Sequence, residues 1–482
     1  MNILILGAGR VGESVAESLA SEQNDITVID TDPVRLAVLQ DRLDLRGVAG
    51  NGIQPSVLKD AGIEDADMFI ACAPLDETNL VACKVAHDVF HVPTTIARIR
   101  SPEFQDETAL TTDKQTGFGV DQVICPEDSV TRTIRKLIEY PVALQVLEFA
   151  QGLLSLVAVR AVPGGPLVQH GLAEIPQLVP NADMRIVAIY RQDKPLTEID
   201  GMTRIEPGDE VFVLAATDDL PNVLAAVRKM DRPVRRLMIA GGGKVGLRLA
   251  RQLAGQMQIK ILEVNRARCD YLATQLPADV LVLNGDSTDE ELMDDENVQD
   301  MDLFLALTSN DEDNIMACLL AKRMGARRVL ALINRKAYAD LVQGTTIDIA
   351  LSPAHAVIGE LLAYVRRGDV EAVHSLRRGA AEALEAVVRG DRGSCRISGR
   401  RIEEVALPRG AQIGAIVRGL PVAGSDESLA LGDKRGDAAP EVIIAHHDTV
   451  IQQGDRVIVF MPSKKQVREV ERLFQVTATF LG

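Results

Sequence analysis

The chain has 482 residues, of which 46% are hydrophobic and 25% are charged, and its formal net charge is -17. This length and composition predict an ordinary globular protein of about three domains and exclude a disordered chain. The acidic balance excludes a nucleic-acid-binding protein and argues against adsorption to anionic lipid, because phosphate groups require a basic face. Polar residues interrupt every apolar run before it reaches about 20 residues, so we expect no membrane span.

The cysteine pattern and the start of the chain predict a reduced compartment. Six cysteines are scattered along the sequence without any C-x-x-C pair. They are Cys72, Cys83, Cys125, Cys269, Cys318 and Cys395. An apolar run begins at residue 2, with no basic segment and apolar core of a signal peptide before it. We therefore expect a protein of the reduced cytosol that is not secreted.

The first stretch, Asn2 to Gly12, is an apolar run followed by G-x-G-x-x-G and then by an amphipathic run. This pattern predicts a strand, a turn and a helix. In the dinucleotide fingerprint, Gly7 would allow the tight turn, Gly9 would let a pyrophosphate approach the backbone, and Gly12 would let helix and strand pack closely. The pyrophosphate then lies at the helix N-terminus.

The next predicted strand supports the same interpretation. Ile26 to Ile29 is apolar and ends at Asp30, about 20 residues beyond the glycines, where a carboxylate binds the ribose 2′-hydroxyl of NAD. A carboxylate at this position would repel a 2′-phosphate. The sequence therefore predicts an NAD site rather than an NADP site.

The whole pattern occurs a second time. Arg236 to Gly246 repeats the glycine-rich turn, and the following apolar run ends at Glu263. Gly50 to Asn79 then aligns with Gly285 to Asn314. The alternation of strand and helix in each copy predicts a doubly wound parallel sheet with right-handed crossovers.

A smaller pattern repeats after each sheet. Met202 to Ala215 aligns with Asp448 to Met461, and each has a Gly-Asp turn before alternating apolar residues, which is typical of a hairpin strand. We therefore predict an α/β protein with two Rossmann-like doubly wound parallel sheets, each followed by a small α+β module. The predicted domains are residues 1–135, 136–232, 233–358 and 359–482, the last with an inserted loop near residues 421–440.

Ligands of such folds bind at the carboxyl ends of the strands. The predicted strand ends bring one set of residues to this edge in each sheet. In the first sheet these are Asp30, Gly50, Asn51, Ala73 and Arg98. In the second sheet they are Glu263, Gly285, Asp286 and Thr308.

An NAD-dependent oxidoreductase is the alternative function. Hydride transfer requires a substrate pocket and a positioned acid or base, yet no large catalytic domain follows either sheet. His87 and His91 are spaced as on one helix face, and the adjacent His446 and His447 would point to opposite faces of a strand. The acidic string Asp289 to Glu296 lacks the glycine and the spacing of a calcium loop, so it predicts a solvated helix start. We therefore predict no catalytic residue and no metal site.

Together these motifs resemble the TrkA family of bacterial potassium-uptake regulators, which are tandem versions of the RCK (KTN) regulatory domain. The resemblance covers nearly the whole chain. Its motifs are GAGRVG with Asp30, DETN at Asp76 to Asn79, ARIRSPE at Ala97 to Glu103, EYPVALQV at Glu139 to Val146, GGGKVG, LALTSNDEDNIMA at Leu305 to Ala317, LAKRMGA at Leu320 to Ala326 and SLRRGAAEALEAV at Ser375 to Val387.

The resemblance implies a non-enzymatic regulatory subunit. Such a protein is cytoplasmic, peripheral on the inner face of the inner membrane, and docks on a TrkH/TrkG-type potassium-translocating protein. It associates with itself into a dimer or a tetramer ring, and it gates potassium uptake in response to NAD(H) and to ATP or ADP.

The resemblance also implies the residues of two nucleotide sites. The first site comprises Gly7, Gly9, Arg10, Val11, Gly12, Asp30, Asn51 and Arg98. The second comprises Gly241, Gly243, Lys244, Val245, Gly246, Glu263 and Asp286. After the fourth strand the first copy has Ala73 where the family usually has a polar pair, whereas the second copy keeps Thr308, and Leu332 stands opposite Arg98. We therefore expect the two sites to differ in affinity or in preferred nucleotide.

A regulator without catalysis must convert ligand binding into a conformational bias. We expect the hinges in the amphipathic segments Ser129 to Tyr140 and Pro353 to Val365, which follow the two sheets. Arg10 and Lys244, next to the second glycine of each fingerprint, are expected to sense additional phosphate charge.

Overall fold

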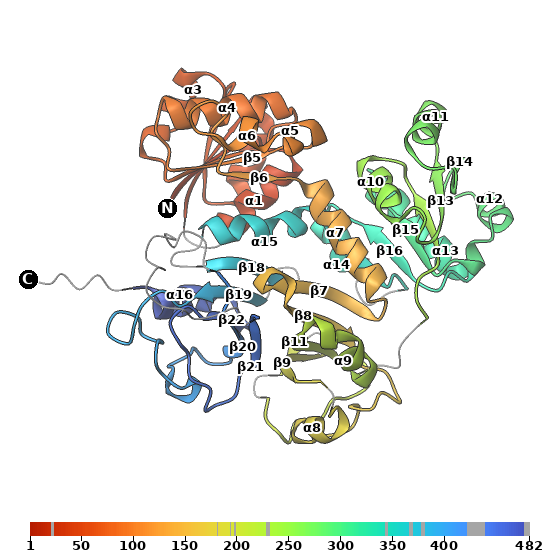
Figure 1. The fold of residues 1–482 in the computed structure, drawn as a ribbon. Coiled ribbons are helices and arrows are strands. Elements are labelled where there is room, and N and C mark those ends of the chain that lie inside the picture. Colours follow the sequence, from red (N-terminus) through yellow and green to blue (C-terminus); the bar gives the residue numbers. More distant parts are fainter. Residues whose placement is uncertain are drawn as a thin grey trace, which may run out of the picture. The chain divides into compact units, whose positions relative to one another are not determined.

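The computed structural model describes residues 1–20, 24–180, 182–192, 194–196, 199–227, 232–342, 346–365, 370–376, 381–421 and 439–476 (Figure 1). Most of the predicted loop near residues 421–440 lies outside these residues. The chain forms two compact units. One comprises Met1–Arg132 and Arg235–Ile358, and the other comprises Thr133–Val234 and Gly359–Gly482.

The first unit contains two parallel sheets with the same strand order. The first sheet has the order β3-β2-β1-β4-β5-β6, and the second has the order β14-β13-β12-β15-β16-β17. The strands of the first are β1 Asn2–Leu6, β2 Asp25–Asp30, β3 Arg46–Ala49, β4 Met68–Ala71, β5 Thr94–Arg98 and β6 Gln122–Ile124. Those of the second are β12 Arg236–Ala240, β13 Gln258–Glu263, β14 Val280–Asn284, β15 Leu303–Ala306, β16 Val329–Leu332 and β17 Ile349–Leu351. This doubly wound order confirms the two predicted Rossmann-like sheets.

Helices lie between the parallel strands in both copies, and one further helix follows the last strand of each sheet. In the first copy they are α1 Arg10–Ala20, α2 Pro33–Arg42, α3 Pro55–Asp60, α4 Asp76–Asp88, α5 Pro102–Asp106, α6 Thr108–Thr112 and α7 Pro126–Glu139. In the second they are α10 Lys244–Leu253, α11 Arg266–Gln275, α12 Glu290–Asp295, α13 Asp311–Met324, α14 Lys336–Val342 and α15 Pro353–Val365. The predicted hinge segments are therefore helical, as α7 and α15.

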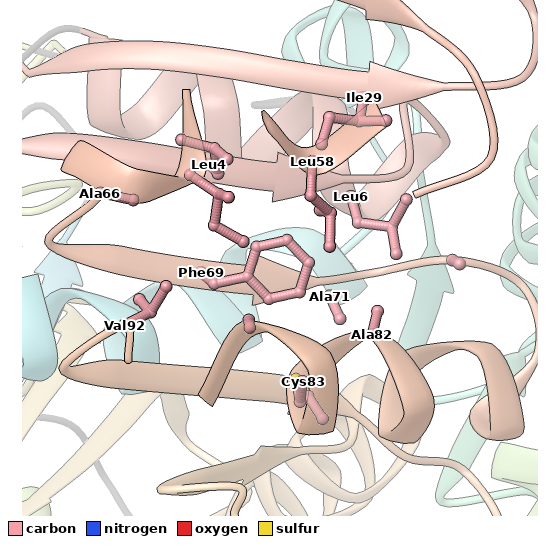
Figure 2. Packing of buried hydrophobic residues seen from close by; sticks show 14 of the residues in the cluster. Leu4, Leu6, Ile29, Leu58, Ala66, Phe69, Ala71, Ala82, Cys83 and Val92 are labelled. Atoms are coloured by element: carbon pink, nitrogen blue, oxygen red, sulfur yellow. The ribbon is translucent and has the colours of Figure 1, made fainter. Parts of the chain in front are cut away.

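The core of the first sheet explains why its strands are apolar along their whole length. Helices cover the sheet, so side chains on both faces are buried. Figure 2 shows Phe69 of β4 packed among Leu4, Leu58 and Cys83, and these four side chains are at most 3% exposed. This packing holds the strand ends, and the turns that follow them, in place.

One helix boundary differs from the sequence prediction. His87 and His91 were expected on one helix face, but α4 ends at Asp88 and His91 has a φ of 55°. Because Pro93 cannot continue a helix and the chain must turn into β5, the helix stops before His91. The predicted pair of histidines on one helix face is therefore wrong.

The second unit contains two antiparallel sheets that also repeat each other. Their orders are β10-β9-β11-β8-β7 and β18-β19-β22-β20-β21. The first has β7 Ala143–Phe149, β8 Leu154–Arg160, β9 Met184–Arg191, β10 Lys194–Pro195 and β11 Glu210–Ala216, with helices α8 Ile175–Leu178 and α9 Leu220–Val227. The second has β18 Val370–Leu376, β19 Ala381–Val387, β20 Gln412–Arg418, β21 Glu441–Ile444 and β22 Arg456–Met461, with helix α16 Val467–Phe474.

The two antiparallel sheets share one hydrophobic core. Phe212 and Leu214 of the first sheet belong to the same buried cluster as Ala415 and Phe460 of the second. A Cβ on Gly414 would lie 2.6 Å from the Leu214 side chain, so the sheets approach each other closely at this glycine. The two modules are therefore packed together as one body.

An ion pair between a partly exposed arginine and a buried aspartate holds the Gly-Asp turn in each module. The Arg191 guanidinium contacts both carboxylate oxygens of Asp209, with its Nε and Nη2 each 2.9 Å away. Arg418 and Asp455 repeat the arrangement at 2.8 and 2.9 Å. The aspartate side chains are 1% and 0% exposed. The turn predicted from sequence is thus held by a paired, buried carboxylate.

None of the helices within the described ranges combines the length and apolarity that crossing a membrane requires.

Candidate nucleotide-binding sites

The first glycine-rich turn has the geometry that the fingerprint requires. Gly7 has a φ of 104°, a conformation that side-chain-bearing residues rarely adopt, and a Cβ there would approach the Cys72 backbone to 3.0 Å. A Cβ on Gly12 would lie 1.9 Å from the Gly7 carbonyl oxygen, so helix α1 approaches β1 as closely as glycine permits. A Cβ on Gly9, by contrast, would meet no protein atom within 4 Å. The open face of the turn is therefore at Gly9.

The second turn repeats each of these features. Gly241 has a φ of 106°, and a Cβ on Gly246 would lie 2.2 Å from the Gly241 carbonyl oxygen. A Cβ on Gly243 would meet no protein atom within 4 Å. Both turns thus leave backbone exposed at the middle glycine, where helices α1 and α10 begin.

The acidic residue at the end of the second strand contacts the glycine turn in both copies. The Asp30 carboxylate accepts hydrogen bonds from the Ala8 amide at 2.6 Å and from the Asp32 amide at 2.8 Å. The Glu263 carboxylate accepts from the Gly242 and Asn265 amides, both at 2.9 Å. Each carboxylate is therefore oriented beside its turn, with lone pairs left for a ribose hydroxyl.

The remaining predicted edge residues occupy loops at the carboxyl ends of the strands. Asn51 and Asp286 follow β3 and β14, and their side chains accept hydrogen bonds from the amides of Ile53 at 3.3 Å and Thr288 at 2.8 Å. Ala73 follows β4. Parallel topology places these loops at the same sheet edge as the glycine turns.

A buried asparagine, which is not among the predicted site residues, organises this edge in each copy. In the first copy, Asn79 is 1% exposed and donates to the carbonyl oxygens of Ala73 at 3.1 Å and Arg98 at 2.8 Å. Asn314 is 0% exposed and binds the Thr308 and Leu332 carbonyls at 3.1 and 2.8 Å. Both asparagines end aligned segments, DETN in the first copy and DEDN in the second. This repeat is the feature of the sequence from which their shared role could have been predicted.

The aspartate that begins the same helix ties down the next loop. In the first copy, Asp76 accepts hydrogen bonds from the amides of Arg100 at 2.9 Å and Ser101 at 2.7 Å. In the second copy, Asp311 accepts from the amides of Asn334 at 2.9 Å and Arg335 at 2.8 Å. Together with the asparagines, these carboxylates join the loops after the fourth and fifth strands of each sheet.

The charge at this edge differs between the copies. Arg98 ends β5 with its side chain 16% exposed, and its nearest carboxylate oxygen is that of Glu127 at 4.0 Å. Its Nε–H is buried and has no hydrogen-bond acceptor in the described part of the protein. Leu332 takes this place in the second copy, where the Thr308 hydroxyl donates to Asn314 at 2.7 Å. Among the described residues, the first copy thus has a half-buried arginine at this position and the second copy has a leucine.

Arg10 and Lys244 are exposed at the starts of α1 and α10, with Val11 half-buried and Val245 buried behind them. Arg10 also lines a cavity of about 210 Å³ with residues of the loop after β15 and with Arg335. The other residues that line it are Ser309, Asn310, Asp311 and Glu312. The turn of the first copy thus faces the edge of the second.

A second contact joins the two copies. Arg248 of α10 pairs with Asp128 at the start of α7, with 2.9 Å between nitrogen and oxygen, and its side chain is 19% exposed. The same guanidinium lies 3.2 Å from the Cys125 sulfur. The helix that begins at the second glycine turn therefore contacts the helix that leaves the first sheet.

The cysteines near these sites have the properties of packed thiols. All six are free and buried. Burial raises the pKa of Cys72, next to Ala73, to about 12, although the positive charge of Arg98 acts in the opposite direction. A thiol in this state is neither a base nor a nucleophile near neutral pH. In the described ranges, no cluster of three or more His, Cys, Asp or Glu could hold a metal ion.

These residues fit a dinucleotide. Gly9 and Gly243 leave room for a pyrophosphate at a helix N-terminus, and Asp30 and Glu263 provide carboxylates for a ribose. In the first copy, the Arg98 guanidinium adds a positive charge at the same sheet edge. We refer to the two arrangements as the first cradle, with Gly9 and Asp30, and the second cradle, with Gly243 and Glu263.

Comparison with known families supports this description. The TrkA-N domain matches residues 3–126 and 237–353, and the TrkA-C domain matches residues 156–227. The chain is 50% identical over 480 residues to the Trk system potassium uptake protein TrkA of Halomonas elongata. It is 46% and 42% identical to the proteins of that name from Vibrio alginolyticus and Haemophilus influenzae. In all three cases the similarity covers 100% of both chains.

Solved structures share the fold at low sequence identity. The GsuK channel superimposes with a TM-score of 0.60 and 17% identity, covering 98% of this chain and 78% of that one. The GsuK RCK domain superimposes with a TM-score of 0.58 and 16% identity, covering 98% and 94%. The arrangement of two parallel and two antiparallel sheets is therefore a fold that this chain shares with the GsuK RCK domain.

Proposed function

The chain belongs to the TrkA family of Trk system potassium uptake proteins, and from this premise we propose that it is a nucleotide-binding regulatory subunit of a potassium transporter. It acts at the inner face of the cytoplasmic membrane, on a TrkH/TrkG-type partner, as a dimer or tetramer ring of identical chains. Its ligands are NAD(H) and ATP or ADP. The observation that carries this proposal is the repeated open glycine turn beside an oriented carboxylate.

The cradles support nucleotides as the ligands. Backbone amides at a helix N-terminus attract phosphate, and Gly9 and Gly243 leave it room. Arg98 adds a positive charge at the sheet edge of the first cradle. Arg10 adds an exposed positive charge where the first glycine turn faces the second copy. A polyphosphate gains more from these cations than a dinucleotide does. Both cradles therefore suit NAD(H) and ATP or ADP, and the first cradle adds cations for the phosphates.

Regulation is better supported than oxidoreductase chemistry. Hydride transfer to a substrate requires a proton donor or acceptor beside the reacting atoms. Cys72 directly follows β4 beside the first glycine turn, and its raised pKa keeps it protonated. The other polar side chains there, Asn79 and Asp76, already hydrogen-bond to backbone groups. Asn79 and Asp76 thus hold the loops, and Cys72 stays protonated, so none of these three side chains acts as the proton donor or acceptor that hydride chemistry needs.

The contact between Arg248 and Asp128 supplies a route for coupling. Arg248 lies one turn beyond Lys244, in the helix whose N-terminus forms the second cradle. Asp128 lies in the first turn of α7, which continues from one compact unit into the other. A ligand that shifts α10 therefore also shifts the support of α7. A nucleotide that binds more tightly when α7 is in one position than when it is in another would provide the energy for regulation.

Binding to the purified protein tests the ligand part of this proposal. We expect NADH and ADP each to raise the melting temperature, since a ligand at 100 times its Kd stabilises the folded state by about 2.7 kcal/mol. Asp30→Ala should weaken binding at the first cradle and Glu263→Ala at the second. If neither nucleotide changes the melting temperature or produces heat in calorimetry, a scaffold without ligands becomes the better account.

Turnover distinguishes the alternative function. An oxidoreductase would consume NADH in the presence of an electron acceptor. The regulatory proposal expects binding of NADH with no oxidation by any acceptor tested, and sustained NADH consumption by the pure protein would refute it.

A further inference from the structure

The second cradle carries an arginine–tyrosine pair on α11, the helix that follows Glu263. The Nε of Arg268 donates a hydrogen bond to the Gly242 carbonyl oxygen at 2.7 Å. The guanidinium carbon of Arg268 lies 4.7 Å from the centre of the Tyr271 ring. The planar cation is therefore held between the glycine turn and an aromatic ring that is 45% exposed.

This pair lies on the ribose side of the cradle. Glu263 accepts the Gly242 amide hydrogen at 2.9 Å, while Arg268 donates to the carbonyl of the same residue. The acidic residue at this strand end is the one that binds the ribose of the adenosine half. The guanidinium and the ring thus flank the place where the adenosine half of a nucleotide enters.

The first cradle lacks this arrangement, although it has the matching arginine. Arg35 is the fifth residue after Asp30, as Arg268 is after Glu263. The Arg35 Nε lies 3.3 Å from a carboxylate oxygen of Asp32, with both side chains largely exposed. Val38, which is 50% exposed, stands where the second copy has Tyr271.

Two exchanges accompany the different arginine positions. The residue after the first glycine of the turn is Ala8 in the first copy and Gly242 in the second, and the helix cap also differs. The residue that caps the helix is Asp32 in α2 and Asn265 in α11. The Asp32 carboxylate attracts its arginine away from the turn, whereas the neutral amide of Asn265 accepts only the Arg268 backbone amide, at 3.0 Å. Arg268 is thereby left to bind Gly242.

We propose that Arg268 and Tyr271 form a stacking platform for the adenine base of a nucleotide in the second cradle. A guanidinium plane on an aromatic ring offers both stacking area and cation–π attraction to a purine. The platform gives the second cradle a higher affinity for adenine nucleotides than the first cradle has. This inference rests on the proposed function, since it assumes that the cradle binds nucleotides.

Two substitutions at one position test the platform. Tyr271→Val copies the first cradle, and Tyr271→Phe keeps the ring. In calorimetry we expect Tyr271→Val to weaken ADP binding at the tighter site about five- to tenfold, with Tyr271→Phe close to wild type. Arg268→Lys keeps the charge but removes the plane, and it should weaken ADP binding like Tyr271→Val. Inorganic pyrophosphate, which has no base, should bind equally to wild type and Tyr271→Val.

The fluorescence of a tryptophan introduced at the platform provides an independent test of base binding. The chain contains no tryptophan, so Tyr271→Trp introduces a single one at the platform. We expect ADP to quench its emission, and pyrophosphate to leave the emission unchanged.

The possible failures are distinguishable. Equal ADP affinity in wild type and Tyr271→Val, or an emission that ADP does not change although ADP binds, would overturn the platform and leave the proposed function standing. Absence of ADP and NADH binding to the wild-type protein would overturn the proposed function itself.

Discussion

Replacing Gly243 with alanine separates the folding of the second cradle from its binding. The backbone at Gly243 has φ -66° and ψ -166°, which alanine adopts, and the added Cβ would meet no protein atom within 4 Å. The folded state should therefore be unharmed. Gly→Ala at such a position stabilises a protein by about 0.4–1 kcal/mol, because the unfolded chain loses freedom.

The same methyl group should obstruct a pyrophosphate. It occupies the open face of the turn and displaces the phosphate from the amides at the start of α10. Losing one hydrogen bond to a charged group costs about 1.5–3 kcal/mol, which lowers affinity roughly 10- to 150-fold. Calorimetry with NADH should thus show one of two binding events lost in Gly243→Ala, and Gly9→Ala should remove the other.

The third glycine provides the matched control. A Cβ at Gly246 would lie 2.2 Å from the Gly241 carbonyl oxygen, so Gly246→Ala should lower the melting temperature as well as binding. Unchanged NADH affinity in Gly243→Ala would refute the placement of phosphate at this turn. Unfolding of Gly243→Ala would refute the description of its open face.

Three further predictions concern the framework around the cradles. Arg191→Met leaves the buried Asp209 carboxylate unpaired and should lower the free energy of unfolding in urea by about 3 kcal/mol, which is the low end for a buried pair because Arg191 is partly exposed. A variant as stable as the wild type would contradict this prediction. Asn314→Ala should lower the unfolding free energy by about 2–3 kcal/mol and also weaken nucleotide binding, because two loop carbonyls lose their donor. A loss of stability with unchanged nucleotide binding would show that these loops do not shape the site. Burial lowers the pKa of His374 below its ordinary value of 6.5, so the folded state holds fewer protons there than the unfolded chain, and stability should fall as pH drops from about 6.5 towards the lowered pKa. His374→Gln should reduce this dependence of stability on pH in urea titrations. An unchanged pH dependence would show that other groups cause it.

Much of the fold and of the cradles could be predicted because local rules dominate them. Gly7 and Gly12 lie where the turn needs a positive φ and a close helix, and both requirements follow from the spacing of the motif. The repeat made the second sheet as predictable as the first. The acidic residues Asp30 and Glu263 were likewise placed by their distance along the chain from the glycines.

Contacts between distant side chains could not be predicted in the same way. Whether Asn79 turns inward to hold two loops depends on backbone groups that approach only in the folded sheet. The pairing of Arg248 with Asp128 depends on how the two copies pack. The orientation of Arg268 depends on the Gly242 carbonyl and on the neutral cap Asn265, where the first copy has Ala8 and Asp32.

Potassium flux through the membrane partner tests the central claim most directly. The transporter would be reconstituted in vesicles with this protein, with NADH, ATP or ADP added in turn, and with Gly9→Ala/Gly243→Ala as the variant that folds but does not bind. We predict a flux that depends on the protein and changes with the nucleotide, and a variant whose flux is the same with every nucleotide. A flux that responds to nucleotides equally with wild type and variant would contradict the claim that these cradles control uptake. A flux that does not respond to nucleotides with either protein would also contradict it.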